Sequence, residues 1–350
     1  MLNKLFERTI PLELFKSIYD KKEITIVHDY SDDDRNEYIF KQLNYTHNIA
    51  LEYNMQPTSS STTNSNIKDN LKIYLDNNEN VILDTLDNNN LNTLNKLITG
   101  FGENILIDIT GINVRLLAII LSALKNYLQV NTSEKCNIYC GYTDSDEYRR
   151  NSLKEIFGDS YNQSSDINVT KGNKKFDFYN AFAGVQDIPF LTSIGSDDVE
   201  RQTWIVLLGF EGERPNRIQS ELSKVDNVIA LVTIPPMRPG WSNYAFEENS
   251  HFLEGIAGTS PEIQYISALS PYSVYNYLCD FQRDSPDNRI LLSPLGTKAT
   301  SLGAILFALN YQTSAFIFDN PYEGSNKEIS KYGNSYIYDV TEALKFDPEV

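Results

Sequence analysis

Short apolar runs alternate along this chain with longer segments of helical periodicity, and this alternation restricts the fold more than any other feature. Runs such as 104–110, 203–210 and 227–234 are dominated by hydrophobic residues, which is typical of strands that are covered on both faces. Strands of this kind, separated by helices, predict a parallel sheet with helices on both sides. We therefore predict an α/β fold of two Rossmann-like halves, each built on a doubly wound, mainly parallel sheet.

Two stretches interrupt the alternation. Residues 55–70, MQPTSSSTTNSNIKDN, are rich in Ser, Thr and Asn, which predicts a solvated loop or mobile insert. Residues 161–200 show weak periodicity and predict a linker or insert. This places an N-terminal Rossmann-like domain at 1–160 and a C-terminal one at 201–350. Either stretch could form a functional lid, but a plain surface loop is the simpler interpretation.

The same sequence pattern occurs twice in the chain, about 185 positions apart. ILIDITGINVRLLAIILSAL (105–124) and ILLSPLGTKATSLGAILFAL (290–309) agree at eight of twenty aligned positions, including Gly111 with Gly296. Both read as a buried strand, a glycine turn, polar residues and a long apolar helix. Such a unit places its turn at the carboxyl end of the strand, where doubly wound sheets bind ligands.

The two turns supply most of the predicted ligand-binding residues. A glycine lets the backbone approach a ligand closely, and the first helical amides carry partial positive charge. Thr297 and Lys298 therefore sit where a phosphate or carboxylate would be held, with Asn113 and Arg115 at similar positions in the first copy. The set is Asp108, Thr110, Gly111, Asn113, Arg115, Gly296, Thr297 and Lys298.

A plainer interpretation of the two turns stays open. Turns of this type need glycine for structural reasons, and Lys298 could be a solvated residue in the first turn of its helix. Neither GxGxxG nor GxxxxGK(S/T) occurs in the chain, so a standard dinucleotide or P-loop site is not supported.

The segment LLGFEGERPNR places charged residues directly after another predicted strand. Glu211 and Glu213 are the predicted catalytic residues if the protein is an enzyme, because paired carboxylates can act as acid and base. Arg214 is a predicted ligand-binding residue. Alternatively, a Glu–Arg ion pair fixes the turn, or Glu213 and Pro215 simply begin a helix.

Other turns carry polar or aromatic side chains in the same position after a strand. HDYSDDDR offers His28, Asp29 and Arg35 for a metal site or for helix caps. Tyr142, in GYTDSDEYRR, is the remaining predicted ligand-binding residue. In TIPPMRPGWSNY, the arginine and Trp241 could stack on a base or serve packing alone.

Charge restricts the class of partner. The net charge of −17 and the pI near 4.6 argue against binding bulk nucleic acid or an anionic membrane. A small basic pocket for one phosphorylated ligand is still compatible with this charge. No apolar run of about eighteen residues predicts a membrane-spanning helix.

The expected location is the cytoplasm. Charged residues interrupt the N-terminal apolar stretch, so it does not predict a signal peptide. Three cysteines, Cys136, Cys140 and Cys279, suit a reducing compartment. Cys136 and Cys140 are expected as buried small hydrophobes rather than as half of a zinc site.

Four motifs follow one another in a fixed order: DITGINVRLLAIIL, YTDSDEY, GFEGER and SPLGTKATSLGAIL. In this combination the chain resembles uncharacterised bacterial Rossmann-like proteins associated with antiphage defence or mobile elements, over about residues 24–320. Those proteins have a YTEP-like motif where this chain has YTDSDE, so a role tied to that proline does not carry over. The DITG turn is also similar to one in CRISPR-associated Rossmann-fold sensor domains, which bind cyclic oligonucleotides. The resemblance implies a fold and a defence context, without an activity.

Three functions are compatible with these patterns. The leading prediction is a sensor or ligand-binding protein for a small phosphorylated or nucleotide-like molecule, with Lys298, Thr297 and Arg115 at the anion. Asp108, Glu211 and Glu213 would then hold ribose hydroxyls or a metal. The second is a nucleotide hydrolase or transferase in which Lys298 stabilises the transition state. The third is a scaffold with a protein partner in a defence complex. No cofactor is identified.

Overall fold

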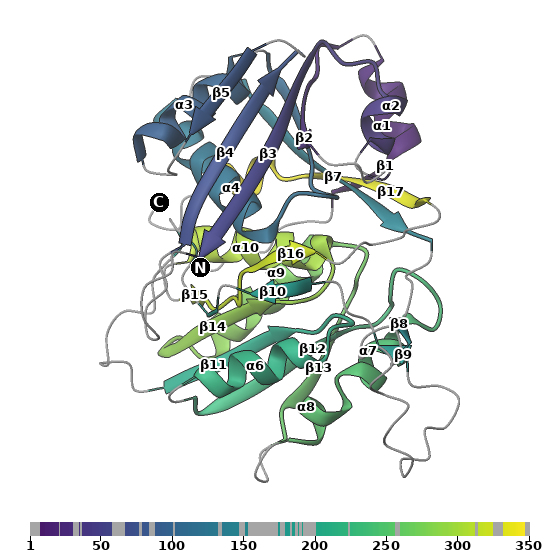
Figure 1. Ribbon diagram of the computed structural model, residues 1–350, viewed down its shortest axis with the longest axis vertical. Helices are drawn as coiled ribbons and strands as arrows, with labels where there is room; N and C mark the ends of the chain where they lie inside the picture. The colour runs from purple at the N-terminus through teal and green to yellow at the C-terminus, as the bar shows by residue number, and fades with distance from the viewer. Residues whose placement is uncertain are drawn as a thin grey trace.

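The computed structural model of this chain is an α/β protein with two separate major sheets (Figure 1). The α/β class predicted from the alternation of strands and helices is confirmed. The structure describes residues 8–20, 22–30, 35, 37–57, 67–76, 79–83, 88–100, 102–131, 135–146, 151–152, 174–175, 179–182, 184–185, 188, 191, 201–222, 225–255, 260–311, 314–324 and 332–346.

The first sheet has eight strands in the order β1-β17-β7-β6-β2-β3-β4-β5. Its central strands β7, β6, β2 and β3 run parallel, whereas the strands on both sides of them pair antiparallel. The strands are Thr9–Pro11 (β1), Thr25–Asp29 (β2), His47–Pro57 (β3), Ile67–Leu75 (β4), Glu79–Leu83 (β5), Asn104–Asp108 (β6), Asn137–Ser145 (β7) and Tyr332–Asp339 (β17).

This sheet is mixed, which differs from the mainly parallel sheet predicted for the N-terminal half. The reason lies in the stretch 55–70, which contains the end of β3 and the start of β4 in addition to residues outside the described part of the chain. Only residues 58–66 separate these strands. A parallel pair needs a crossover of about a dozen residues or more, so the short connection forces an antiparallel hairpin.

The second major sheet has five parallel strands in the order β13-β12-β11-β14-β15. Helices separate β11 from β12, β12 from β13 and β13 from β14 in the sequence, and β14 is followed by another helix before β15. The strands are Arg201–Leu207 (β11), Asn227–Thr233 (β12), Glu262–Ile266 (β13), Asn288–Pro294 (β14) and Ser314–Phe316 (β15). The parallel sheet predicted for this part of the chain is therefore present.

Two smaller sheets have two strands each. β10 pairs antiparallel with β16, and β8 pairs antiparallel with β9. Their strands are Asn151–Ser152 (β8), Lys174–Lys175 (β9), Tyr179–Phe182 (β10) and Pro321–Gly324 (β16).

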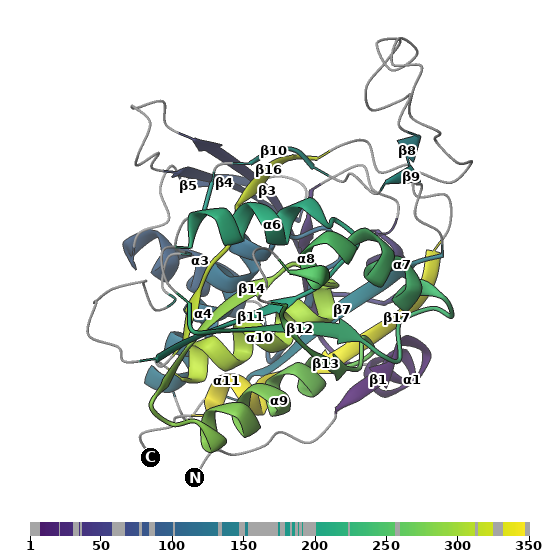
Figure 2. The same ribbon diagram turned by 90° about the horizontal axis from the view of Figure 1, so that it is seen from below.

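Helices cover the outer faces of both major sheets and fill the space between them (Figures 1 and 2). α1 and α2 pack on one face of the eight-stranded sheet, with Phe15 and Ile39 fully buried. α6, α7 and α8 lie outside the five-stranded sheet, while α4, α9 and α10 lie between the sheets. The helices are Leu12–Tyr19 (α1), Tyr38–Gln42 (α2), Asn88–Thr99 (α3), Val114–Val130 (α4), Glu213–Glu221 (α6), Trp241–Glu248 (α7), Ser250–Glu254 (α8), Pro271–Asp284 (α9), Lys298–Asn310 (α10) and Thr341–Lys345 (α11).

α4 and α10 explain how the two sheets are joined. α10 is buried on nearly all sides and packs against α4, α9 and α11, as expected for a helix that is apolar around its whole circumference. Lys125 of α4 donates hydrogen bonds of 2.6 Å to Asn310 Oδ1 of α10 and to the carbonyl of Phe346. These bonds satisfy a buried ammonium group and connect the two helices of the repeated pattern.

The C-terminal part of the chain contributes to both sheets, because β17 pairs with β7 and β1. The predicted linker at 161–200 lies largely outside the described residues, and the domain boundaries stay a prediction. All three cysteines are buried and not disulfide-bonded. Within the described segments, no helix has both the length and the apolar character needed to cross a membrane.

Candidate functional site

A pocket lies where the carboxyl ends of strands from both sheets meet. Its lining includes Thr110 after β6, Phe210 after β11, Pro236 after β12, Ala268 after β13 and Gly296 after β14. Its volume is about 130 Å³, counted as the space open to the centre of a water molecule, and on this measure one water needs only about 10–15 Å³. Because α/β proteins bind ligands at the carboxyl ends of their strands, this pocket is the candidate site.

The repeated pattern forms the units β6–α4 and β14–α10, and the turns of both units lie at this pocket. Lys298, in the second turn, donates a hydrogen bond from Nζ to the backbone carbonyl of Ile112 in the first turn. The two copies therefore face each other, and the pocket lies beside their contact.

Both turns end in a residue that caps its helix. Asn113 Oδ1 accepts the backbone N–H of Arg115 at 2.8 Å, and Thr297 Oγ1 accepts the N–H of Thr300 at 3.3 Å. The second helix begins one residue earlier than the alignment implies, because α10 begins at Lys298, which aligns with the capping residue Asn113. The polar residues of the turns thus have a structural role in addition to lining the pocket.

Cationic side chains outnumber acidic ones in the lining. Arg35, Arg214 and Lys298 contribute positive charge, and among the described lining residues Glu211 is the one carboxylate. These cations come from three separate segments: the one after β2, the start of α6 and the start of α10. A chain with a net charge of −17 therefore concentrates positive side chains at this pocket.

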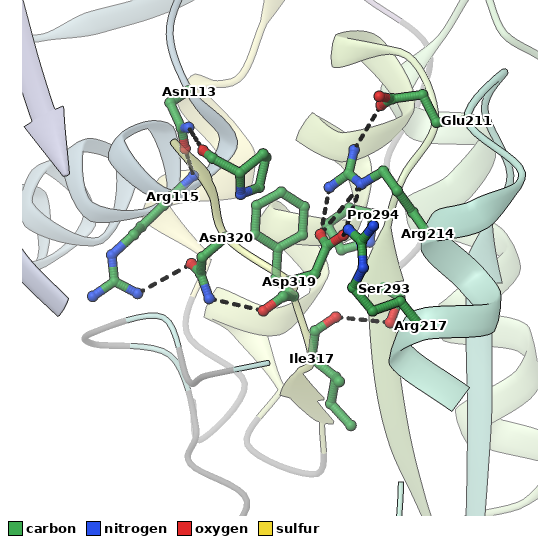
Figure 3. Close-up of polar contacts among 12 residues, drawn as sticks. Asn113, Arg115, Glu211, Arg214, Arg217, Ser293, Pro294, Ile317, Asp319 and Asn320 are labelled. Atoms are coloured by element: carbon green, nitrogen blue, oxygen red, sulfur yellow. Dashed lines mark hydrogen bonds and ion pairs between the residues drawn. The ribbon is translucent and has the colours of Figure 1, made fainter. Parts of the chain in front are cut away.

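Arg214 belongs to a buried ion-pair network (Figure 3). Its Nη2 and Nε donate to the two oxygens of the fully buried Asp319 at 2.6 and 3.0 Å, and Nη1 donates to Glu211 Oε2 at 3.2 Å. Arg217 Nη1 approaches Asp319 at 3.5 Å, and its guanidinium lies 3.7 Å from the ring centre of Phe182. The geometry thus contains the Glu–Arg ion pair that the sequence allowed, and this pair holds Glu211 in place.

Arg115 lies outside the pocket lining. Its Nε and Nη2 donate to both carboxylate oxygens of Asp69 at 3.0 and 3.1 Å, and Nη1 reaches Asn320 Oδ1 at 3.4 Å. Asp69 also accepts the hydroxyl of Tyr53 at 2.5 Å. In Figure 3 the guanidinium extends to the far side of Asn320 from Arg214. Arg115 therefore joins α4 to the β3–β4 hairpin, which differs from its predicted contact with an anion.

Asp108 lies just behind the pocket wall. Its Oδ1 accepts the Thr110 hydroxyl at 2.6 Å and the Thr110 backbone N–H at 3.0 Å, while Oδ2 is buried and has no hydrogen-bond partner. Burial raises the pKa of Asp108 to about 7, although the charge of Arg35 and the bonds from Thr110 act in the opposite direction. The carboxyl therefore changes its protonation state near neutral pH.

Asp144, near the end of β7, is a second buried carboxyl. Burial raises its pKa to about 6, and the nearby Arg238 acts in the opposite direction. Arg238 Nε lies 3.5 Å from Asp144 Oδ2, and its Nη1 lies 2.7 Å from Asp146 Oδ1. These contacts connect the β12–α7 loop of one sheet to β7 of the other.

Aromatic and apolar side chains form an apolar wall within the lining. Phe210 and Trp241 both line the pocket, with ring centres 5.5 Å apart and planes at 86°. Met237, Leu208 and Ala245 continue this apolar surface. Edge-to-face packing of this kind is a favoured arrangement for aromatic pairs.

The structure brings most of the predicted residues together. Eight of them line the pocket: Thr110, Asn113, Tyr142, Glu211, Arg214, Gly296, Thr297 and Lys298. Asp108, Gly111, Arg115 and Glu213 are not part of the lining. Glu213 is exposed in the first turn of α6, where a carboxylate interacts favourably with the helix dipole, so its position matches the helix-start interpretation better than the catalytic one.

The glycines of GFEGER serve close backbone packing. A Cβ atom on Gly209 would lie 2.2 Å from the carbonyl oxygen of Leu295, and one on Gly212 would lie 1.8 Å from that of Glu248. Only glycine allows these approaches. The glycines therefore bring the β11–α6 turn against the β14–α10 turn and α7.

His28 takes part in packing within the eight-stranded sheet. Its Nε2 lies 2.7 Å from Asn48 Oδ1, and its ring stacks on Phe40 with centres 5.0 Å apart. Within the described ranges, no group of three or more His, Cys, Asp or Glu residues could hold a metal ion. These contacts give His28 a structural role in place of the metal site considered from the sequence.

Sequence reasoning did not select several residues that shape the site. Asp319 follows the apolar run SAFIF, so a polar residue after a strand was its available signal. Asp69 lies in the polar stretch 55–70, which resembles a loop, so the sequence did not indicate that Asp69 pairs with Arg115. Phe210 lies in GFEGER, where the charged neighbours gave a stronger signal for a site than the aromatic residue did.

No protein-family model, curated protein or solved structure matches this chain. The resemblance to bacterial defence-associated proteins stays a prediction.

Proposed function

We propose that the pocket binds a small phosphorylated or nucleotide-like molecule and that the protein acts as a ligand-binding or sensor protein. The observation that carries the proposal is the meeting of Arg35, Arg214 and Lys298 at strand ends from two sheets, in a strongly acidic chain. Guanidinium and ammonium groups are the usual partners of phosphate. Negative charge elsewhere on the chain disfavours nucleic acid in bulk, whereas a local cluster of cations can still hold one small anion.

The position of Lys298 supports an anion near the second turn. Lys298 is the first residue of α10, and the N-terminus of a helix favours negative charge through its dipole and its first amides. Its contact with the Ile112 carbonyl orients the ammonium group beside the pocket. We therefore place the anionic group of the ligand beside Lys298.

We also propose that the two sheets represent two Rossmann-like halves. The equivalent units β6–α4 and β14–α10 support this interpretation, as does the parallel order β13-β12-β11-β14-β15. A role in bacterial antiphage defence, in the cytoplasm, follows only from the resemblance of the motifs and belongs to the same proposal.

The test compares wild type with Lys298→Met in thermal-shift titrations with inorganic phosphate, pyrophosphate and nucleoside monophosphates. A ligand at one hundred times its Kd stabilises the folded state by about 2.7 kcal/mol, which for a chain of this size raises the Tm by roughly 4 °C. We expect this shift in wild type and its loss in Lys298→Met. Each shift is measured from the Tm of the same variant without ligand, because the substitution also removes the bond to Ile112.

Two variants control this experiment. Lys345→Met removes an exposed lysine of α11 that is not in the pocket lining, and it should keep the full shift. Lys298→Arg keeps the positive charge and should keep part of it. Equal shifts in wild type and Lys298→Met would contradict the placement of the anion, and the absence of a shift with every anion would contradict the proposed function.

An enzyme that hydrolyses or transfers nucleotides is the second candidate, and the position of Asp108 favours it. A carboxyl whose pKa is about 7, bonded to the pocket residue Thr110, suits proton transfer near neutral pH. Glu213, by contrast, is exposed and outside the lining. Turnover of a bound nucleotide by wild type and not by Asp108→Asn, with unchanged binding, would select this candidate.

A further inference from the structure

The pocket lining contains two chemically different groups of side chains. The first is cationic and polar and includes Arg35, Arg214 and Lys298. The second, the apolar wall, includes Phe210 after β11 and Trp241, the first residue of α7. A ligand that fills the pocket can therefore contact both aromatic rings and positive charge.

The apolar wall has the geometry of an aromatic binding surface. The ring planes of Phe210 and Trp241 are nearly perpendicular, and Tyr244 adds a second edge-to-face contact to Phe210 at 6.4 Å and 83°. Phe210 and Trp241 are only partly buried although they line a cavity. In an edge-to-face pair one ring presents its edge and the other its face, and here both rings belong to the pocket lining.

We infer that the ligand carries a planar heteroaromatic ring that packs on the wall of Phe210 and Trp241, joined to a single anionic group held near Lys298. The chemical class is that of a nucleoside monophosphate. This inference rests on the proposed anion-binding function and goes beyond it by requiring a ring. Stacking on an aromatic side chain tolerates all bases, because every base has a π-face. Specificity for one base would have to come from the polar groups of the lining.

The distribution of tryptophan provides a direct signal for this contact. The chain has two tryptophans. Trp204 is fully buried in the core and donates from Nε1 to Ser293 Oγ at 2.8 Å, whereas Trp241 lines the pocket. A ring that packs on the apolar wall should change the emission of Trp241 and leave that of Trp204 constant.

The experiment measures the affinities of the four nucleoside 5′-monophosphates and of ribose 5-phosphate, which carries the same phosphate without a ring. Each ligand is titrated against wild type, Trp241→Leu, Trp241→Phe and Lys298→Met, with thermal shift and tryptophan emission as readouts. Stacking on an aromatic residue predicts that at least one monophosphate binds wild type about tenfold more tightly than ribose 5-phosphate. Trp241→Leu should abolish this preference and leave the affinity for ribose 5-phosphate within twofold, while Trp241→Phe should keep part of it.

Controls separate the inference from the function on which it rests. Tyr265→Leu removes an exposed aromatic residue of β13 that does not line the pocket, and it should change neither affinity. If ribose 5-phosphate binds as tightly as every monophosphate, and Lys298→Met weakens both, the inference that the ligand carries a ring is overturned while the proposed anion binding stands. If neither kind of ligand binds, both are overturned. If Trp241→Leu does not fold, Trp241→Phe and the emission of wild type still decide the question.

Discussion

Replacing Asp319 by asparagine tests how much the buried ion pair between Arg214 and Asp319 stabilises the fold. Asp319 is fully buried and accepts from Arg214 through both oxygens, at 2.6 and 3.0 Å. Removing one member of a buried pair typically costs about 3–5 kcal/mol, because the other charge is left without compensation. Glu211 stays 3.2 Å from the same guanidinium, so we expect a loss near the lower end, about 3 kcal/mol. The measurement is the free energy of unfolding from urea denaturation.

The coupling between the two side chains separates this explanation from a general loss of packing. Arg214→Met combined with Asp319→Leu removes both charges, and we expect it to be clearly more stable than the sum of the two single changes predicts. Glu37→Gln, which breaks the exposed pair with Lys41, should cost less than about 1 kcal/mol. A loss below about 1 kcal/mol for Asp319→Asn, or additive effects in the double variant, would refute the reasoning.

Two further predictions concern Asp108 and Arg115. Burial raises the pKa of Asp108 to about 7 from an ordinary 3.8, so the folded state binds this proton more tightly than the unfolded state does. The protonated carboxyl therefore contributes stability at low pH, and this contribution is lost as the pH rises through about 7. Between pH 5 and pH 8 this loss amounts to about 3 kcal/mol, at 1.36 kcal/mol per pH unit below the folded-state pKa. The free energy of unfolding, measured by urea denaturation at both pH values, should therefore decrease less for Asp108→Asn than for wild type. Equal decreases would contradict the assignment. Arg115→Met should lower the free energy of unfolding by about 3 kcal/mol or more, since it leaves Asp69 buried without its partner, yet it should change the affinity for a phosphorylated ligand less than twofold. A large loss of affinity would instead show that Arg115 contributes to ligand binding, as predicted from the sequence.

Local patterns were sufficient for the features that depend on neighbouring residues. The buried strand, glycine and apolar helix around Gly111 and Gly296 were readable, because each unit satisfies its own backbone and cap within about twenty residues. Since the carboxyl ends of parallel strands gather at one edge of a sheet, reading residues after predicted strands also found Lys298, Arg214 and Glu211. This rule accounts for seven of the eight predicted residues that line the pocket; the eighth, Tyr142, lies within β7.

Contacts between distant parts of the chain could not be read in this way. Arg115 meets Asp69 from 46 positions away, and Arg214 meets Asp319 from 105 positions away. Nothing in the sequence near Arg115 indicates a buried carboxylate, because its partner lies in a polar stretch that resembles a loop. The same limitation applies to β17, which crosses back to the eight-stranded sheet, and to the antiparallel strands at the edges of that sheet. Their positions depend on the pairing of strands in three dimensions rather than on local propensity.

The location of the pocket between two sheets gives ligand binding a mechanical consequence. On one side Lys298 contacts the Ile112 carbonyl, and on the other the β12–α7 loop contacts β7 through Arg238, whose Nε lies 3.3 Å from the Ser145 carbonyl. Trp241, the first residue of α7, directly follows this loop. Lys298 and Trp241 follow strands of the five-stranded sheet, whereas Thr110 and Tyr142 of the lining lie on or after strands of the eight-stranded sheet. A ligand that contacts both groups therefore adds its binding free energy to contacts between the sheets. A sensor needs such an arrangement, because a ligand can shift a conformational equilibrium only through contacts that differ between the two states.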